Sequence, residues 1–297
     1  MISAFSPGQI TGFFKSHYSN DLLFSGSTGA GVCITHGVKT SVTLKPSQKT
    51  KFQIKINNKS TNDALVSQFV AKTITSKLDQ NYDIYIQHYS DLPIGCGYGS
   101  SGSAALSLAY ALNEALSLDM SPEKAAQIAH TAEIKCRTGL GTVLSLYHGG
   151  AQLRLAPGAP GIGKVLKFNS SNRVIATFTL GNLSTKYILS NPSVHFYIND
   201  IGQTLLQEFT DNPSADFFLT LSRNFTLAMN LFPYQLYQFM KLAARYDITC
   251  SMNMFGHSIF SLIKSNEKTE FYNLFRKSKL KGKLFFSNID NIGARLL

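Results

Sequence analysis

Three glycines at alternate positions, Gly95, Gly97 and Gly99, lead into the most helix-prone segment of the chain. From residue 93 onward this segment reads PIGCGYGSSGSAALSLAYALNEAL. The backbone N–H groups that open a helix have no partner within the helix, and they lie at the positive end of its dipole. Glycines allow the backbone to curl closely around phosphate oxygens because they have no Cβ. This junction therefore favours a phosphate-binding site.

Serines follow the glycines at Ser100, Ser101 and Ser103. Their hydroxyls can complete a phosphate cage or ligate Mg²⁺, which prefers oxygen ligands, although the same serines could cap the helix. The stretch has neither the GK[ST] of a Walker A loop nor the GxGxxG of a dinucleotide fingerprint. A glycine-rich turn before an ordinary core helix remains an alternative on this pattern alone.

A second polar group lies on the helix predicted over residues 121–137, where Ser121 is suited to cap the N-terminus. Because each helical residue advances by about 100°, His130, Glu133 and Arg137 form a polar stripe beside an apolar side. A carboxylate next to a serine-lined phosphate loop suits Mg²⁺, which takes one or two protein oxygens in addition to phosphate oxygens. An amphipathic helix with a solvated edge and an ion pair would show the same stripe.

A lone arginine, Arg154, stands between Leu153 and Leu155 in a short predicted strand. Successive side chains of a strand point to opposite faces, so Arg154 should project away from the two leucines. Its planar guanidinium can hold a carboxylate through two parallel hydrogen bonds. An exposed arginine on an edge strand would have the same sequence pattern.

Alternation of apolar and polar residues predicts several strands in the first 90 residues. The clearest are residues 38–44, 51–56 and 82–86. The segment 101–116 is apolar nearly all round, which indicates a buried helix. A stretch rich in Gly and Pro over residues 149–164 marks a change of domain, and the remainder mixes strands with helices. We therefore expect an α+β protein with domains at residues 1–165 and 166–297.

The composition of the 297 residues, 44% hydrophobic and 15% charged, is that of a globular protein. No run of 18 apolar residues predicts a membrane span, and the first residues lack the basic start and apolar core of a secretory signal. The cysteines have no CxxC spacing, which indicates free thiols in a reducing compartment. They are Cys33, Cys96, Cys136 and Cys250. We therefore expect a cytoplasmic protein without a membrane partner.

The net charge of +11 raises nucleic acid as a partner. The basic residues are spread along the chain, however, and the densest group, in residues 276–283, has no accompanying nucleic-acid motif. A solvated basic surface is the simpler interpretation, so we expect no nucleic-acid partner. Positive potential also suits a small anionic substrate such as a nucleotide.

The glycine–serine stretch resembles the central motif of the GHMP kinases, usually P-x-G-x-G-L-G-S-S-A-A. Tyr98 stands where Leu is common and Gly102 replaces the usual Ala, whereas the matching positions are Pro93, Gly95, Gly97, Gly99, Ser100 and Ser101. Within this family, further stretches look like the archaeal pantoate kinases. These stretches are residues 4–14, 26–40, 129–143, 149–161 and 251–262.

This resemblance implies transfer of the γ-phosphoryl group of ATP to the 4-hydroxyl of pantoate, giving 4-phosphopantoate for coenzyme A synthesis. It also implies an N-terminal domain like ribosomal protein S5, a ferredoxin-like C-terminal domain and, by analogy, a homodimer. A GHMP kinase for another small alcohol, such as homoserine or a mevalonate derivative, remains an alternative. So does a weakly active relative that binds nucleotide or nucleic acid.

The resemblance also assigns roles to individual residues. Glu133 and Ser103 would hold Mg²⁺, with Ser101 a further serine near the metal or the phosphates. ATP would lie over the loop that contains Pro93, Gly95, Gly97, Gly99, Ser100, Ser101 and Ser103. The acceptor would contact Ser27, His130, Arg154 and Thr185.

Thr142 departs from the family pattern, since TGLGTV stands where TGLGDV is common. A threonine hydroxyl can ligate Mg²⁺ or bond an acceptor oxygen, but it cannot act as a general base at neutral pH. Because the transition state of phosphoryl transfer is loose, positioning and charge neutralisation can carry most of the reaction. We therefore keep Thr142 among the expected catalytic residues, in a role other than that of a base.

Overall fold

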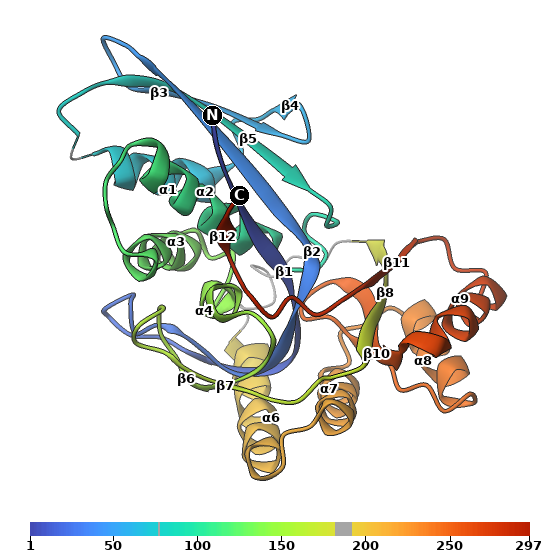
Figure 1. The fold of residues 1–297 in the computed structure, drawn as a ribbon. Helices are drawn as coiled ribbons and strands as arrows, with labels where there is room; N and C mark the ends of the chain where they lie inside the picture. The colour runs from blue at the N-terminus through green and yellow to red at the C-terminus, as the bar shows by residue number, and fades with distance from the viewer. Residues whose placement is uncertain (77, 182–191) are drawn as a thin grey trace.

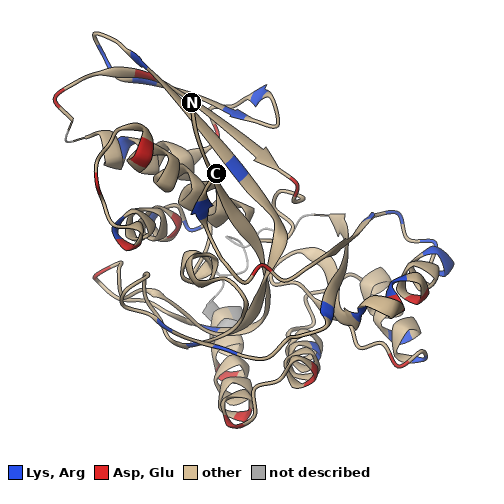
Figure 2. Ribbon diagram, viewed as in Figure 1, with Lys and Arg blue, Asp and Glu red and all other residues tan. Residues whose placement is uncertain are grey.

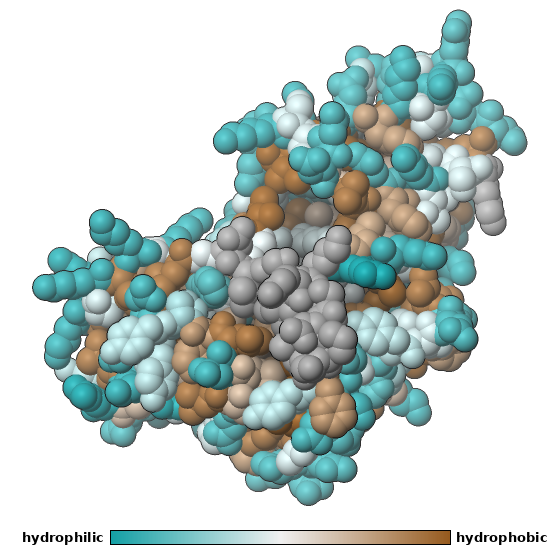
Figure 3. Space-filling view, turned by 180° about the vertical axis from the view of Figure 1, so that it is seen from behind, coloured by the Kyte–Doolittle hydropathy of each residue, from teal (hydrophilic) through white to brown (hydrophobic). Residues whose placement is uncertain are grey.

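Residues 1–76, 78–181 and 192–297 are described by a computed structural model, in which helices pack against two β-sheets (Figure 1). Seen from behind, hydrophilic side chains cover the outer ends of the molecule, and hydrophobic ones are more frequent toward its middle (Figure 3). Basic residues are spread over both halves, with several on the last helix and the loop that follows it (Figure 2). Among the described residues, no helix is long and apolar enough to cross a membrane.

The N-terminal sheet is built around two long antiparallel strands, β1 (Ile2–His17) and β2 (Gly26–Pro46). Its other strands are β3 (Lys51–Ile56), β4 (Lys59–Ser60), β5 (Tyr82–Ser90), β6 (Ala151–Ala156), β7 (Lys164–Lys167) and β12 (Arg295–Leu296). The strand order is β12-β1-β2-β5-β3-β4, and β6 pairs with both β2 and β7. The three strands predicted from alternation are therefore confirmed within β2, β3 and β5.

Four helices cover one side of this sheet, of which α2 and α4 contact its strands directly and α1 and α3 pack on α2 (Figure 1). They are α1 (Leu65–Thr75), α2 (Ser100–Ala115), α3 (Pro122–Cys136) and α4 (Thr142–His148). Helix α2 lies against β1 and β2 and also packs on α1, α3 and α4, so that Leu106, Leu108 and Leu112 are fully buried. This position explains why its apolar residues run nearly all round the helix. Ser121 caps α3 as expected, because its Oγ accepts a hydrogen bond from the Lys124 N–H at 3.1 Å.

The C-terminal sheet is antiparallel and has the strand order β11-β8-β10-β9. Its strands are β8 (Arg173–Gly181), β9 (Ser251–Met252), β10 (His257–Lys264) and β11 (Lys283–Ser287). The helices of this part are α6 (Pro192–Asp211), α7 (Ala215–Met229), α8 (Tyr234–Ala244) and α9 (Lys268–Lys277), with a short 3₁₀ helix η1 (Ser265–Glu267). Counted in chain order, the strands are arranged 4-1-3-2, which is the ferredoxin-like arrangement that we expected.

An aromatic cluster joins the two sheets. Phe218 of α7 lies between Phe13 of β1 and Phe260 of β10, with ring centroids 6.3 Å and 6.0 Å away. Phe209 of α6 meets Phe13 edge to face at 5.7 Å. All four rings are fully buried in one continuous core. Because a packed core resists deformation, this cluster holds the two sheets in a fixed relation.

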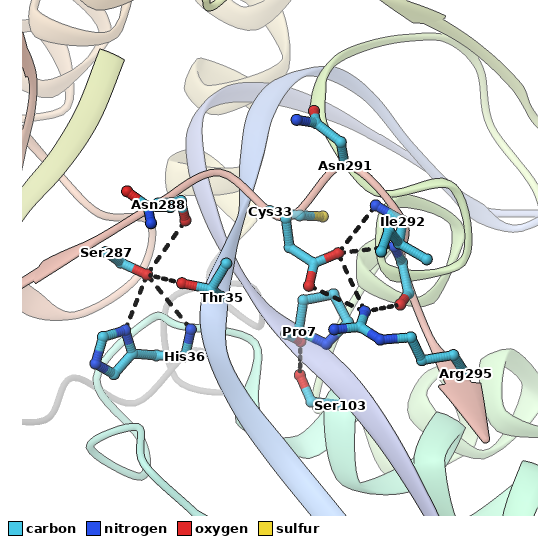
Figure 4. Close-up of polar contacts among 12 residues, drawn as sticks. Pro7, Cys33, Thr35, His36, Ser103, Ser287, Asn288, Asn291, Ile292 and Arg295 are labelled. Atoms are coloured by element: carbon cyan, nitrogen blue, oxygen red, sulfur yellow. Dashed lines mark hydrogen bonds and ion pairs between the residues drawn. The ribbon is translucent and has the colours of Figure 1, made fainter. Parts of the chain in front are cut away.

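The last residues of the chain return to the N-terminal sheet, where β12 pairs with β1 (Figures 1 and 4). The buried carboxylate of Asp290 accepts hydrogen bonds from the N–H groups of Ile292 and Gly293 and forms an ion pair with Arg295 at 3.0 Å. The division into residues 1–165 and 166–297 stays a prediction, because β7 spans the boundary and the final strand belongs to the first sheet.

Asp290→Ala should lower the free energy of unfolding by about 2–3 kcal/mol, because it leaves the buried N–H of Gly293 and the partly buried N–H of Ile292 without their acceptor and breaks the ion pair with Arg295. Urea denaturation measures this loss. The control is Asp216→Ala, which breaks the exposed ion pair with Arg173 and should cost less than about 1 kcal/mol. Equal losses in the two variants would contradict the anchoring role of Asp290.

Candidate active site

A cleft of about 680 Å³ opens where the two sheets meet. Its walls come from the glycine loop (residues 95–99), the start of α2, the loop 137–142 after α3, Arg154 of β6 and the segment 254–255 before β10. Most of the residues that sequence reasoning selected therefore come together in one place. Thr185 lies outside the described residues, and its predicted role stays a prediction.

The glycine loop has a backbone conformation that favours glycine. Gly95, Gly97 and Gly99 have φ angles of 73°, 87° and 66°, in the left-handed region. A Cβ on Gly99 would also lie 2.8 Å from Cγ2 of Thr142. Gly99 is the N-cap of α2 and no side chain caps that helix, so its opening N–H groups stay free of a helical partner. The loop thus has the form of an anion cradle.

Glu133 brings a buried carboxylate to the cleft. Its side chain is 3% exposed, and Oε1 accepts a hydrogen bond from the Thr138 hydroxyl at 2.8 Å. Burial raises the pKa of Glu133, whereas hydrogen bonds from Thr138 and Ser101 lower it. No Lys or Arg forms an ion pair with Glu133 within the described ranges. A buried carboxylate without a cation, beside a serine hydroxyl, has the donor chemistry of a divalent metal site.

Ser103 does not line the cleft, contrary to our expectation. It is fully buried, and its hydroxyl donates to the carbonyl of Pro7 at 2.6 Å (Figure 4). Two residues correspond to about 200° around a helix, so Ser101 and Ser103 point in nearly opposite directions. Ser101 is the serine that lines the cleft beside Glu133, whose pKa its hydroxyl lowers. Ser107 lies one turn after Ser103 and is also fully buried, so the two serines share the buried face of α2. This spacing of four residues is the sequence signal that we missed.

Arg154 brings a buried cation to the same cleft. It is 1% exposed, which excludes the alternative of a surface arginine on an edge strand. Its Nε donates to the backbone oxygen of Ser27 at 3.3 Å and its Nη1 to Ser145 Oγ at 3.1 Å. Burial lowers the pKa of Arg154 to about 10. No carboxylate pairs with it in the part of the chain that the structure describes, so the guanidinium is suited to an incoming anion.

Ser27 and His130 are placed differently from each other. Ser27 lines the cleft, and its hydroxyl donates to the carbonyl of Leu140 in the loop after α3. His130 is 1% exposed and does not line the cleft. Its Nε2 lies 3.2 Å from the carbonyl oxygen of Leu22 and 3.0 Å from that of Ser25, so the ring supports the turn that precedes Ser27. Burial lowers the pKa of His130.

Thr142 is the first residue of α4 and lines the cleft next to the glycine loop. Among the described residues, Glu133 and Asp63 are the carboxylates of the cleft lining. Sequence reasoning missed Thr138, which also lines the cleft, and it placed Arg137 in the polar stripe without giving it a role at the site. Both residues lie in the RTGLGT stretch that carries the family likeness. Sequence reasoning missed Ser145 as well, because this partner of Arg154 shows no motif of its own.

A chain of buried polar side chains runs beneath the cleft. Ser107 Oγ lies 2.6 Å from Thr40 Oγ1, which lies 2.8 Å from His88 Nδ1, and His88 Nε2 lies 3.1 Å from Ser67 Oγ. Ser67 and His88 line the cleft at the start of α1. Burial lowers the pKa of His88 to about 4, so the ring is neutral at physiological pH.

Comparison with known proteins gives consistent results. A family model described as the GHMP kinases N terminal domain matches residues 64–150. A pantoate kinase of Methanocaldococcus jannaschii is 34% identical over 261 residues, which cover 88% of this chain and 92% of that protein. A solved structure of a phosphotransferase related to the coenzyme A biosynthesis pathway is 27% identical, with a TM-score of 0.91 over 100% of this chain and 98% of that chain.

More distant structures share the fold. The structure of MDDEF in complex with MVAPP, AMPPCP and magnesium is 14% identical to this chain, with a TM-score of 0.76 over 100% of this chain and 98% of that chain. The α+β class and the two-part fold predicted from the sequence are therefore confirmed.

The stability of the protein should depend on His88 in acid. Between pH 6.5 and about 4 the unfolded chain binds a proton at this ring and the folded protein does not, so stability is lost as the pH falls through this window. The full effect corresponds to roughly 3 kcal/mol. Urea denaturation of wild type and His88→Gln at pH 7 and pH 4.5 tests this, and we expect a smaller loss in the variant. The same loss in both proteins would contradict the buried neutral ring.

Proposed function

The chain belongs to the pantoate kinase family of the GHMP kinases, and we propose that it transfers the γ-phosphoryl group of ATP to the 4-hydroxyl of pantoate. The product is 4-phosphopantoate, a precursor for coenzyme A synthesis. The observation that carries this proposal is Arg154, a buried guanidinium without an acidic partner among the described residues, in the same cleft as the glycine loop. Pantoate has the carboxylate that such a cation requires.

The nucleotide binds over the glycine loop. The free N–H groups at the start of α2 bond the phosphate oxygens, and the left-handed glycines keep the backbone close to them. The exposed apolar side chains of Leu65 and Ile94 line the outer part of the cleft, and the buried polar side chains of Ser67 and His88 line its inner part nearby. This part has the mixed character of a site for the nucleoside.

Glu133 and Ser101 hold Mg²⁺ in this proposal. The fit rests on the donor set, because a buried carboxylate with no cationic partner among the described residues stands beside a hydroxyl and next to the phosphate loop. When bound, Mg²⁺ neutralises the charge that develops on the phosphate oxygens. Thr138 keeps the Glu133 carboxylate oriented through its 2.8 Å hydrogen bond. Ser103 supports the start of α2 from behind, through Pro7.

The acceptor binds against Arg154 with its carboxylate. Ser27 and Ser145 fix the guanidinium, and Ser27 also holds the carbonyl of Leu140 and thereby the loop that leads to Thr142. Thr142 bonds an oxygen of the acceptor or of the transferred group and removes no proton. ADP is the leaving group, and the proton of the 4-hydroxyl passes to an oxygen of the transferred phosphoryl group or to water. Catalysis then rests on positioning and charge neutralisation, which suffice for a loose transition state. Thr185 and His130 keep their roles at the acceptor only as implied by the family resemblance.

A coupled ADP-release assay tests the function directly, with pantoate, homoserine, mevalonate and shikimate offered in turn. Turnover with pantoate alone supports the proposal, and turnover with homoserine or mevalonate alone would replace it by the corresponding GHMP activity. Size-exclusion chromatography tests the homodimer expected by analogy. The four thiols, all of them free, agree with a cytoplasmic location, where ATP is abundant.

Arg154→Ala should raise the KM for pantoate by about 100-fold or more, because two charge-assisted hydrogen bonds to the carboxylate are lost. The KM for ATP should change by less than about threefold. Arg154→Lys keeps the charge without the planar fork and should have an intermediate effect. Arg173→Ala, at a partly buried arginine that does not line the cleft, serves as the control. An unchanged KM for pantoate in Arg154→Ala would show that the acceptor binds elsewhere.

Ser101→Ala and Ser103→Ala separate the metal site from its support. In Ser101→Ala the Mg²⁺ concentration for half-maximal activity should rise about tenfold, because one oxygen near the metal is lost. In Ser103→Ala the Mg²⁺ dependence should stay at the wild-type value, while unfolding requires about 1–2 kcal/mol less free energy. The reverse pattern would restore Ser103 as the metal-facing serine.

A further inference from the structure

Tyr98 stands in the middle of the glycine loop, where related kinases commonly have leucine, and it is 1% exposed. Its hydroxyl leaves the loop and enters the C-terminal sheet. There it lies 2.7 Å from Thr177 Oγ1 and 2.9 Å from Thr179 Oγ1, both on β8. The ring packs against Phe285 of β11 with a centroid distance of 5.7 Å. A leucine would fill part of this space but could not bond the two threonines.

The hydroxyls of Thr179, Tyr98 and Thr177 and the carbonyl of Ile259 form a chain of hydrogen bonds in which each donor and acceptor can be assigned. The Thr177 hydroxyl donates its proton to the carbonyl of Ile259 at 2.7 Å, so it can only accept from Tyr98. Tyr98 therefore donates to Thr177, and Thr179 donates to Tyr98. Every buried hydroxyl in this chain has a partner, and such fully satisfied networks strongly favour one arrangement. The chain links the glycine loop to the two central strands of the C-terminal sheet.

Further contacts hold the same loop. Ser258 of β10 donates to the carbonyl of Cys96 at 2.9 Å, and the Gln9 N–H of β1 donates to the carbonyl of Tyr98 at 2.9 Å. Gly256 approaches so closely that a Cβ there would collide with the Cys96 carbonyl. The loop is therefore fixed between β1 on one side and the β8–β10 pair on the other.

We propose that Tyr98 is a positioning residue that holds the glycine loop in its phosphate-binding conformation, and that its hydroxyl thereby sets the affinity for the nucleotide. Three glycines in a short loop have many accessible conformations, so ordering them on binding costs free energy. A loop that is already fixed by the C-terminal sheet avoids part of this cost. The identity of the ligand as a nucleotide rests on the proposed function; the fixation of the loop does not.

The coupling is reciprocal. If the contact with β8 favours nucleotide binding, a bound nucleotide must stabilise the contact between the loop and β8 by the same free energy. Nucleotide should therefore protect the junction of the two sheets against unfolding, and the protection should decrease when the Tyr98 hydroxyl is removed.

Tyr98→Phe tests the inference, because it keeps the buried ring and removes only the hydroxyl. Calorimetric titration with Mg·ADP, without any acceptor, should show a Kd about five- to tenfold above wild type. In the activity assay the KM for pantoate should change by less than about twofold. Thr179→Val removes the donor at the other end of the chain and should weaken ADP binding in the same direction. Combined with Tyr98→Phe, it should add less than its separate effect.

Ser261→Ala is the matched control. Ser261 lies on β10, the strand that also carries Ser258. Its hydroxyl donates to the carbonyl of Thr249 at 2.6 Å and does not contact the glycine loop. This variant should lose stability as Tyr98→Phe does, yet bind ADP like wild type. Wild-type ADP affinity in both Tyr98→Phe and Thr179→Val, with only a lower Tm, would overturn the inference.

Two further outcomes are decisive. If Tyr98→Phe does not fold, the ADP affinity of Thr179→Val alone decides. If the wild type binds ADP in the expected manner but does not phosphorylate pantoate, the proposed acceptor is wrong and the role of Tyr98 stands.

Discussion

Two buried charges of opposite sign, neither of them neutralised by a neighbouring side chain among the described residues, determine how the rest of the cleft must be built. Glu133 is 3% exposed and Arg154 is 1% exposed, and they line one cleft without pairing with each other. Taking an ion out of water costs several kcal/mol unless a partner compensates. The free protein carries this cost, and a metal and an anionic substrate would remove it. The uncompensated charges therefore favour the binding of a metal ion at Glu133 and of an anionic substrate at Arg154.

Hydrogen bonds from neighbouring elements hold the Glu133 and Arg154 side chains in place. The turn after α3 returns over Glu133, so that Thr138 bonds the carboxylate, and Ser27 ties that turn to β2. Arg154 is held by a backbone oxygen of β2 and by Ser145 of α4. These elements rest on the packed helices and on the aromatic cluster between the sheets. Precision at the cleft therefore depends on residues that never contact a ligand.

Local patterns predicted much of this protein. Alternation predicted the strands, and the glycines before an apolar segment predicted a tight turn that opens a buried helix, because these features depend on the types and spacing of residues close in the chain. The choice between Ser101 and Ser103 went wrong because it depends on which side of α2 faces β1. His130 carries no local sign that it supports a turn more than 100 residues away. The partners of Tyr98, Thr177 and Thr179, lie about 80 residues further along, where no sequence period connects them.

The pairing of β12 with β1 affects how the protein can form during synthesis. Ala4 faces Leu296, so this part of the edge of the first sheet acquires its outermost strand only after residues 295–296 have been synthesised. Until then β1 exposes unpaired N–H and C=O groups, which other chains can join. Contacts so distant along the chain also slow folding. Residues 4–5 of β1 thus stay open to pairing with other chains until the strand of the sheet that is made last has docked.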